Sequence, residues 1–369
     1  MLLVLVLTHQ CDLACGYCYA GPKDARRMPR AVGERAIERA LLAVPPGGTL
    51  RLGLFGGEPL LAWDVGRELV ALARARAAAR GDGVRVETSL TTNGTHLDAR
   101  ALSELLALEV QVSVSMDGLP AVHDAARPDR GGGPSSAAAL AAIDRLVASG
   151  ARFQVISVVR PESLAALADG ARFLAERGVP TLLHSLDHSA PWRPAHGPRL
   201  RRAIAGLREV WVERFPRLQV AWLEGKAALL LDRRLVKPVC GVGQGEVAVA
   251  PSGRLYPCER LVGDDAPGPF AAGHVDEEGP LRLGRAFSAR PGPASAGTGA
   301  GCDGCAAEPY CANACACANL ARTGALDGPD GLICALEQAC LLEARLGLQQ
   351  LAGRRPAPRP LPLVVARSS

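Results

Sequence analysis

Six short apolar segments alternate with longer amphipathic segments over the first half of the chain. The apolar segments, which we expect to be strands, cover residues 2–8, 50–55, 84–90, 110–116, 152–159 and 179–186. The segments between them have helical spacing and predict helices at 30–44, 64–80, 97–107, 135–149 and 162–177. Such alternation is typical of a parallel α/β sheet, either open or closed into a full or partial barrel. In each case the chemistry lies at the C-terminal ends of the strands.

The second half of the chain has a different texture. One more helix is predicted at about 197–214, and after about Leu235 glycine, proline and cysteine dominate. A segment so poor in apolar residues needs staples in order to fold. By composition, 290–301 is a flexible link, about 332–350 is a last helix, and the Pro/Arg-rich end is extended or disordered. We predict three parts, which are a barrel with its bridging helix, a small Cys-rich domain and a tail, at 1–235, 236–348 and 349–369.

Composition argues against two classes of function. The net charge is +5, but basic residues are scattered among Glu and Asp and aromatic residues make up only 4%, so no nucleic-acid surface is indicated. No apolar run reaches the length of a membrane span. The opening MLLVLVL lacks the basic flank and cleavage site of a signal peptide. We expect a buried first strand and a cytoplasmic protein.

The twelve cysteines fall into a front set and a back set. Cytoplasmic cysteines stay reduced, so their clustering indicates metal binding rather than disulfides. Cys11, Cys15 and Cys18 follow the first predicted strand with the spacing Cys-x3-Cys-x2-Cys. Three thiolates can hold an iron–sulfur cube and leave one iron open to another ligand. A zinc loop that lacks its fourth ligand is the alternative.

Further candidate stretches fall at the ends of the next predicted strands. GGEP (56–59) ends the second strand, TTNG (91–94) the third and SVSMDG (113–118) the fourth, which HDAAR follows as far as Arg127. Glycines let the backbone approach a ligand closely, and a glutamate can bind an ammonium group. A plain Gly-Gly turn, a helix cap and a surface ion pair are the structural alternatives for these stretches.

The front cysteine motif with its aromatic Tyr17, followed one strand later by GGEP, resembles the signature of the radical S-adenosylmethionine enzymes. The resemblance implies that Cys11, Cys15 and Cys18 hold a 4Fe–4S cluster whose open iron binds the amino and carboxylate groups of S-adenosylmethionine. An electron from the cluster then yields a 5′-deoxyadenosyl radical, which removes hydrogen from an unactivated position. GGEP would hold the methionyl amino group. The predicted contacts to the cofactor are Tyr17, Gly56, Gly57, Glu58, Pro59, Thr92, Asn93, Ser115 and Arg127.

The back cysteines follow a second pattern, Cys240-x12-Gly253-x4-Cys258, then Cys302-x2-Cys305-x5-Cys311-x3-Cys315, then Cys334. This pattern resembles the SPASM domain, a C-terminal extension of many radical S-adenosylmethionine enzymes. The resemblance implies a partial (β/α)6 barrel, open at one side, and two auxiliary 4Fe–4S clusters that take up an electron. Two structural zinc sites are the alternative. The implied ligands are Cys302, Cys305, Cys311 and Cys334 for the outer cluster, and Cys240, Cys258 and Cys315 for the inner one.

The inner cluster lacks one cysteine. Sulfatase-maturing relatives have another cysteine a few residues after the Cys240 position, and the segment CGVGQGEVAV has none. Either one iron is open to a substrate thiolate or to water, or another residue such as Cys317 completes the site. We expect Cys340 to be a packed thiol on the last helix.

Glu259, directly after Cys258, is the candidate catalytic base. Sulfatase-maturing enzymes carry an aspartate there, and a carboxylate beside a cluster can take the proton when a substrate radical is oxidised. A solvent-facing acid is the alternative. His184 and His188 could face a substrate, but we expect them, like His9, to be packing or loop histidines.

The resemblance spans about residues 2–345 and implies an enzyme that abstracts hydrogen from a peptide or protein side chain. Our first expectation is maturation of a ribosomally synthesised peptide by a thioether or carbon–carbon cross-link or a similar oxidation. The second is formylglycine formation on Cys or Ser of a sulfatase. A zinc-stapled binding scaffold is the non-enzymatic alternative. We expect a ferredoxin or flavodoxin as electron donor, and leader-peptide recognition either at the barrel mouth or by a separate protein.

Overall fold

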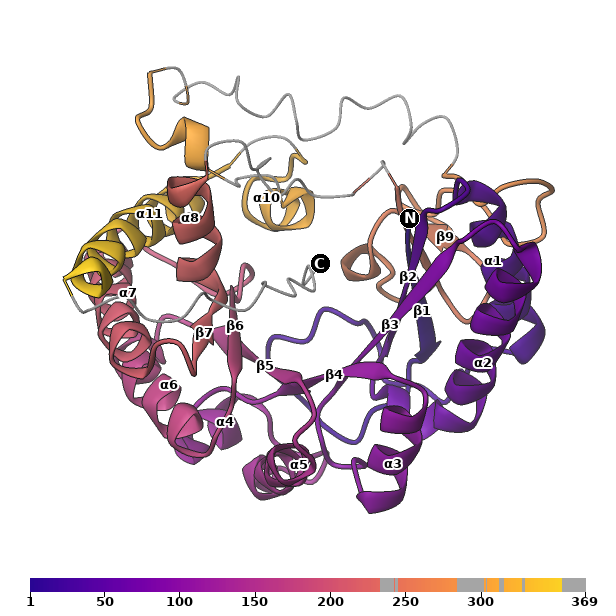
Figure 1. Cartoon of the computed structure of the whole chain (residues 1–369), viewed down its shortest axis with the longest axis horizontal. Coiled ribbons are helices and arrows are strands. Elements are labelled where there is room, and N and C mark those ends of the chain that lie inside the picture. Colours follow the sequence, from indigo (N-terminus) through magenta and orange to yellow (C-terminus); the bar gives the residue numbers. More distant parts are fainter. Residues whose placement is uncertain are drawn as a thin grey trace.

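A computed structural model of the chain describes residues 1–232, 242, 245–283, 302, 304–311, 315–326 and 329–353. Its centre is a nine-stranded sheet with the order β7-β6-β5-β4-β3-β2-β1-β8-β9. In Figure 1 the strands form an arc with helices along its outer side. Because β7 and β9 are edges of the sheet, the barrel is partial, as the sequence predicts.

The strands are β1 (Leu2–Thr8), β2 (Thr49–Gly56), β3 (Arg85–Thr92), β4 (Val110–Ser115), β5 (Phe153–Val159), β6 (Thr181–Leu186), β7 (Gln219–Val220), β8 (Glu246–Val249) and β9 (Leu255–Tyr256). The α-helices are α1 (Arg30–Ala43), α2 (Trp63–Arg80), α3 (Ala99–Ala107), α4 (Pro120–Ala126), α5 (Ser136–Ser149), α6 (Leu167–Glu176), α7 (His196–Arg214), α8 (Ala221–Leu231), α10 (Ala316–Thr323) and α11 (Gly331–Ala352). The short 3-10 helices are η1 (Pro59–Ala62), η2 (Leu164–Ala166), η3 (Glu259–Leu261) and η5 (Glu308–Tyr310).

The six predicted strands are confirmed as β1 to β6, and each pairs in parallel with the next. The structure adds β7 beside β6 and β8 beside β1, both parallel, and β9 as an antiparallel partner of β8. The sequence analysis missed these three strands because two to four residues are too few to show a period. It also missed α4, α8 and α10.

β1 shows why the first strand has no polar face. Leu3, Leu5 and Leu7 are fully buried in the large core that α1 and α2 share. Val4 and Val6 point to the other side and pack with residues of β8 and β9. A strand covered on both sides reads as a continuous apolar run, which is typical of parallel sheets.

The last helix ties the end of the described chain to the barrel. α11 packs against α7 and α8, on the same side of Figure 1. Arg208 Nε lies 2.7 Å from a carboxylate oxygen of Glu343, and Lys226 Nζ lies 2.5 Å from one of Glu337. α11 continues to Ala352, beyond the residue at which the sequence analysis begins the tail.

The division of the chain at residues 235 and 236 stays a prediction, and both residues lie outside the described part, as do 290–301 and 354–369. β8, which follows that boundary, belongs to the same sheet as β1. Within the described residues, none of the helices combines the length and the apolar character that crossing a membrane requires.

Candidate active site

A cavity of about 280 Å³ lies inside the arc of strands. Small or polar side chains lie among the apolar ones that line it, and together they leave this space unfilled. The loops after β1, β2 and β3 border it, and so does the segment around η3. Inward-facing strand residues that line it include Gly53, Ser89, Ser113, Gln154 and Ser185.

The front cysteines converge on this cavity. All of Cys11, Cys15 and Cys18 line it, with Cys11 buried and Cys18 exposed. Backbone hydrogen bonds hold their loop against the segment after α4: Ala14 N donates to Pro128 O at 2.8 Å, and Gly16 N donates to Ala126 O at 3.1 Å. Burial raises the pKa of Cys11 to about 11, although the N–H of Leu13 opposes the shift. The Cys11 thiol therefore needs a metal centre in order to ionise near neutral pH.

The two glycines of GGEP let β2 approach the cysteine loop. A Cβ on Gly57 would lie 2.3 Å from Gln10 O, and one on Gly56, where φ is 149°, would lie 2.4 Å from Thr8 O. Gly57 N donates to Thr8 O at 2.8 Å. Both glycines also line the cavity. The two glycines therefore allow β2 to pack closely against the backbone of residues 8–10.

Glu58, the third residue of GGEP, is held by hydrogen bonds inside the protein. Its side chain is fully buried and accepts hydrogen bonds from Leu60 N at 3.0 Å, Thr92 Oγ1 at 2.8 Å and Asn93 N at 2.7 Å. Burial raises its pKa to about 7, against these hydrogen bonds. Neither Glu58 nor Pro59 lines the cavity. Glu58 thus joins the ends of β2 and β3. Its contact with the methionyl amino group stays a prediction.

The other predicted cofactor contacts do line the cavity. These are Tyr17, Gly56, Gly57, Thr92, Asn93, Ser115 and Arg127. Asn93 Nδ2 donates to Asp12 Oδ1 at 2.8 Å, which orients its amide beside the cysteine loop.

Arg127 lies in a buried cluster with Tyr17 and Asp117, and the sequence analysis gave Asp117 no role. Its Nε and Nη2 donate to the two carboxylate oxygens of Asp117 at 3.0 and 3.2 Å. The Tyr17 hydroxyl donates to the same carboxylate, and the guanidinium lies 5.1 Å from the centre of the Tyr17 ring. Because Asp117 and Arg127 are both buried, the alternative of a surface ion pair is wrong. Asp117 fixes the orientation of Arg127 toward the cavity.

Glu259, Arg260 and His188 also line the cavity. Glu259 is 3% exposed, so the alternative of a solvent-facing acid is wrong. The Arg260 guanidinium stacks 4.2 Å from the centre of the Tyr19 ring. Burial lowers the pKa of His188 to about 4, so its imidazole is neutral at neutral pH.

The remaining predicted histidines pack inside the protein. His184 is buried against the Trp222 ring, with 5.2 Å between ring centres, and it does not line the cavity. His9 is 1% exposed, and its Nε2 lies 3.8 Å from a carboxylate oxygen of Asp265.

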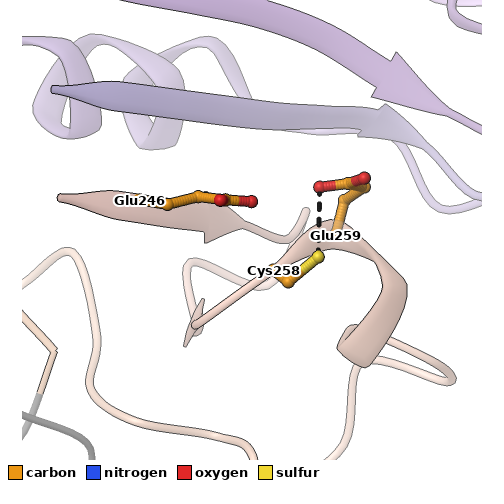
Figure 2. Close-up of side chains that lie close together, drawn as sticks. All are labelled: Glu246, Cys258 and Glu259. Carbon is orange, nitrogen blue, oxygen red and sulfur yellow. Dashed lines mark hydrogen bonds between the residues drawn. The ribbon is translucent and has the colours of Figure 1, made fainter. Parts of the chain in front are cut away.

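Several acids and thiols lie close together around Cys258, one of the cysteines implied for the inner cluster. Figure 2 shows Glu246 of β8, Cys258 and Glu259 turned toward one another, and their ligand atoms lie within 4.8 Å of one another. Cys317 makes a side-chain hydrogen bond with Cys258, and both are buried. Cys315 interacts electrostatically with Cys317 and Glu259. Cys240 lies outside the described residues.

Three of the cysteines implied for the outer cluster, Cys302, Cys305 and Cys334, lie near one another. Cys334, in the first turn of α11, interacts electrostatically with Cys302 and Cys305. Cys311 follows η5, and its N–H donates to Glu308 O at 3.2 Å. Cys340, farther along α11, is buried in the main core, as expected for a packed thiol.

Comparison with known proteins identifies the class. Residues 5–174 match the Radical SAM superfamily. These residues therefore form a radical SAM domain, and the groups that such a domain implies are a 4Fe–4S cluster and S-adenosylmethionine. The donor set fits the cluster, because three thiols from one loop open on one cavity and thiolates are the ligands that iron–sulfur clusters take.

Two relatives extend the similarity past that range. A serine-type anaerobic sulfatase-maturating enzyme of Klebsiella aerogenes is 28% identical over 294 residues, 73% of this chain and 67% of that one. Mycofactocin maturase MftC of Mycobacterium ulcerans is 28% identical over 375 residues, 96% of this chain and 90% of that one. An uncharacterized protein of Methanocaldococcus jannaschii is 26% identical, and the match covers 53% of this chain and 64% of that protein's length, just under two thirds.

Solved structures share the fold. The structure of anSMEcpe with bound AdoMet superposes with a TM-score of 0.76 at 18% identity, and covers 96% of this chain and 99% of that one. Streptococcus suis SuiB bound to precursor peptide SuiA gives a TM-score of 0.61 at 15% identity, with 90% of this chain and 75% of that one covered.

Proposed function

We propose that this enzyme matures a peptide or protein substrate by abstracting hydrogen from one of its side chains. The observation that carries the proposal is the shared cavity. The front cysteine loop borders it, and so does Glu259, which follows a back cysteine. A substrate in this cavity would touch both centres.

On the front side, we assign the 4Fe–4S cluster to Cys11, Cys15 and Cys18. When bound, the cluster and S-adenosylmethionine supply a reductively generated radical that removes a hydrogen atom. Arg127, oriented by Asp117, offers a fixed positive charge to a carboxylate. Asn93 and Ser115 offer polar contacts at the ends of β3 and β4, and the Tyr17 ring borders the same space.

Glu259 is the proposed proton acceptor. It is buried, borders the cavity and lies 3.5 Å from Cys258 Sγ through Oε2. A carboxylate at this position can take the proton released when the substrate radical loses an electron. Arg260 follows it and contributes a positive charge beside it.

We further propose that the back cysteines form a SPASM domain with two auxiliary 4Fe–4S clusters that accept that electron. The proximity of Cys302, Cys305 and Cys334 supports the outer cluster, which Cys311 would complete. Cys258 and Cys315, with Cys240 beyond the described residues, would serve the inner cluster. A ferredoxin or flavodoxin is the proposed electron donor.

A peptide is the proposed substrate class. One relative, whose match covers 96% of this chain, is called a mycofactocin maturase. SuiB, which shares the fold, has been solved with its precursor peptide. The proposed product is a cross-linked or similarly oxidised peptide, with the leader bound at the cavity mouth or by a separate protein. Formylglycine formation is the second candidate, which the sulfatase-maturating relative and the fold of anSMEcpe favour.

The test is anaerobic incubation of the reconstituted enzyme with S-adenosylmethionine, dithionite and candidate peptides, followed by mass spectrometry. Peptides encoded beside the gene and Cys- or Ser-containing sulfatase peptides form the two arms. Loss of a hydrogen pair from a gene-neighbour peptide supports maturation, and an aldehyde on a sulfatase peptide supports formylglycine formation. Nucleoside product without change in any peptide would contradict the proposed substrate class.

A further inference from the structure

Lys23 carries a buried positive charge beside the front cysteines. Its side-chain nitrogen, Nζ, is buried and has no hydrogen-bond partner in the described part of the chain. Lys23 lines the cavity together with Cys11, Cys15 and Cys18. A buried ammonium group is costly unless a negative charge compensates it. An anion bound in the cavity would supply that compensation.

The main chain around Lys23 is held at two points. Arg130 Nη2 donates to Lys23 O at 2.9 Å. The backbone N of Arg130 donates to Asp12 O at 3.1 Å, so Arg130 links Lys23 to the start of the cysteine loop. Gly21 lies against Gly263, whose carbonyl leaves no room for a Cβ at position 21. The side chain of Lys23 thus begins at a fixed point of the backbone.

The charge of Lys23 acts on two of the front cysteines. Burial raises the pKa of both Cys11 and Cys15, and the positive charge of Lys23 opposes the shift at each of them. Glu58 and Asp12 act on Cys11 in the opposite direction. Lys23 therefore favours negative charge on these thiols, against burial and the two acids.

Arg127 is a second cation near Cys15, but its charge is used differently. Its guanidinium donates to both carboxylate oxygens of Asp117, at 3.0 and 3.2 Å. Much of the positive charge of Arg127 is thus balanced inside the protein. Lys23 has no such bond in the described residues, so its charge is available to a group bound by the cysteines.

A cluster held by thiolates is the anion that this position suits. Each thiolate brings a negative charge, and reduction of the cluster adds one more. Positive charge nearby stabilises the reduced form, most strongly where water is excluded, and so raises the reduction potential.

We propose that the ammonium group of Lys23 compensates the negative charge of the front 4Fe–4S cluster and thereby raises its midpoint potential. One electron passes from the donor, which is oxidised, to the cluster, which is reduced, and no bond forms or breaks at Lys23. The inference rests on the proposed function, because it presupposes the cluster on Cys11, Cys15 and Cys18. The carboxylate of S-adenosylmethionine is the competing anion.

The test measures the midpoint potential of the front cluster by EPR titration of the reconstituted full chain without S-adenosylmethionine. The front signal is the part that disappears when Cys11, Cys15 and Cys18 are replaced by alanine. Lys23→Met removes the charge and keeps an unbranched side chain, whereas Lys23→Arg keeps the charge. Arg85→Met is the matched control, since Arg85 is exposed at the start of β3 and does not line the cavity. Melting temperatures check that each variant is folded.

We expect Lys23→Met to keep the wild-type iron content and to shift the front midpoint potential to a more negative value. Lys23→Arg and Arg85→Met should keep the wild-type potential, because the first retains the local charge and the second removes a distant one. The dissociation constant of S-adenosylmethionine should stay close to the wild-type value in all three variants.

A wild-type potential in Lys23→Met would overturn the inference, and weaker binding of S-adenosylmethionine in that case would assign Lys23 to the cofactor carboxylate instead. Loss of the front iron from Lys23→Met but not from Lys23→Arg would support charge compensation, whereas loss from both would contradict it. If the wild type itself shows no front signal, then the cluster of the proposed function fails, and Lys23 fails with it.

Discussion

At the scale of single residues, Asp117 of SVSMDG holds several groups of the site in place through hydrogen bonds. It accepts from both Arg127 and Tyr17, and its Oδ1 also accepts from Val158 N at 2.8 Å. Removing one partner of a buried ion pair leaves an uncompensated charge.

Asp117→Ala should therefore cost about 3–5 kcal/mol of stability, and it should weaken binding of S-adenosylmethionine because Arg127 is no longer oriented. Tyr17→Phe, which removes only a hydroxyl, should cost about 1 kcal/mol. Thermal melting and equilibrium binding of the cofactor measure the two effects. Equal melting temperatures for both variants would contradict the role given to Asp117.

His123 gives the fold an acid-sensitive point. It is fully buried in α4, where its Nδ1 accepts from Asp117 N at 3.3 Å and its Nε2 lies 3.0 Å from Ser135 Oγ. Burial, with Arg127 nearby, lowers its pKa from 6.5 to about 4. Since the folded state disfavours the proton, this contribution to stability is complete above 6.5 and is lost as the pH falls toward 4.

Between about pH 8 and about pH 6, His123 should remove about 1 kcal/mol of stability from the wild type. His123→Gln should show a shallower fall over the same range, because its side chain does not titrate. Melting temperatures of both proteins at the two pH values measure the difference. A steeper fall in the variant would be inconsistent with a neutral buried imidazole.

At the scale of elements, the end of β2 and the cysteine loop form one unit. The loop's position depends on Gly56 and Gly57 lying against the backbone of residues 8–10. The same strand end also carries Glu58, which fixes the end of β3 through Asn93. A change in GGEP should therefore reach the cysteines.

Gly57→Ala should lose most of the front cluster, because its Cβ would lie 2.3 Å from Gln10 O. Gly16→Ala is the matched control: it lies in the cysteine loop itself, and a Cβ there would meet nothing within 4 Å. Iron per chain, measured in the two variants, shows whether the front cluster depends on Gly57. Retention of the front cluster in Gly57→Ala would show that the loop tolerates displacement.

Local pattern predicted the elements well, because β1 to β6 and the main helices carry clear periods. The spacing of the cysteines along the chain also indicated which of them lie close together. It did not predict Asp117 or Glu246, since an acid beside a strand end carries no mark of its burial. It did not predict the hydrogen bonds of Glu58, because these depend on residues 35 positions away, such as Asn93.

At the scale of the whole molecule, α11 links the back cysteines to the barrel. Cys334 lies in its first turn, and farther along Gly347 faces α7, where an added Cβ would lie 2.4 Å from the Trp211 ring. The position of Cys334 relative to the barrel therefore depends on how α11 packs on α7 and α8.

Gly347→Ala should thus lower the melting temperature, because overpacking a core typically costs about 1–3 kcal/mol. It should also make the back iron easier to remove with a chelator. Gly331→Ala, in the same helix with nothing within 4 Å of the added Cβ, is the control and should match the wild type in both measurements. Identical chelation rates in the two variants would argue against coupling between α11 packing and the outer set.

The central claim is that the front loop and the back cysteines are parts of one radical enzyme. The most direct measurement counts iron and sulfide per chain after anaerobic reconstitution and assays 5′-deoxyadenosine after addition of S-adenosylmethionine and dithionite. We predict about twelve irons and nucleoside product for the wild type, and about eight irons without product when Cys11, Cys15 and Cys18 are replaced by alanine. Zinc in place of iron, or nucleoside product that survives loss of the front cysteines, would contradict the claim.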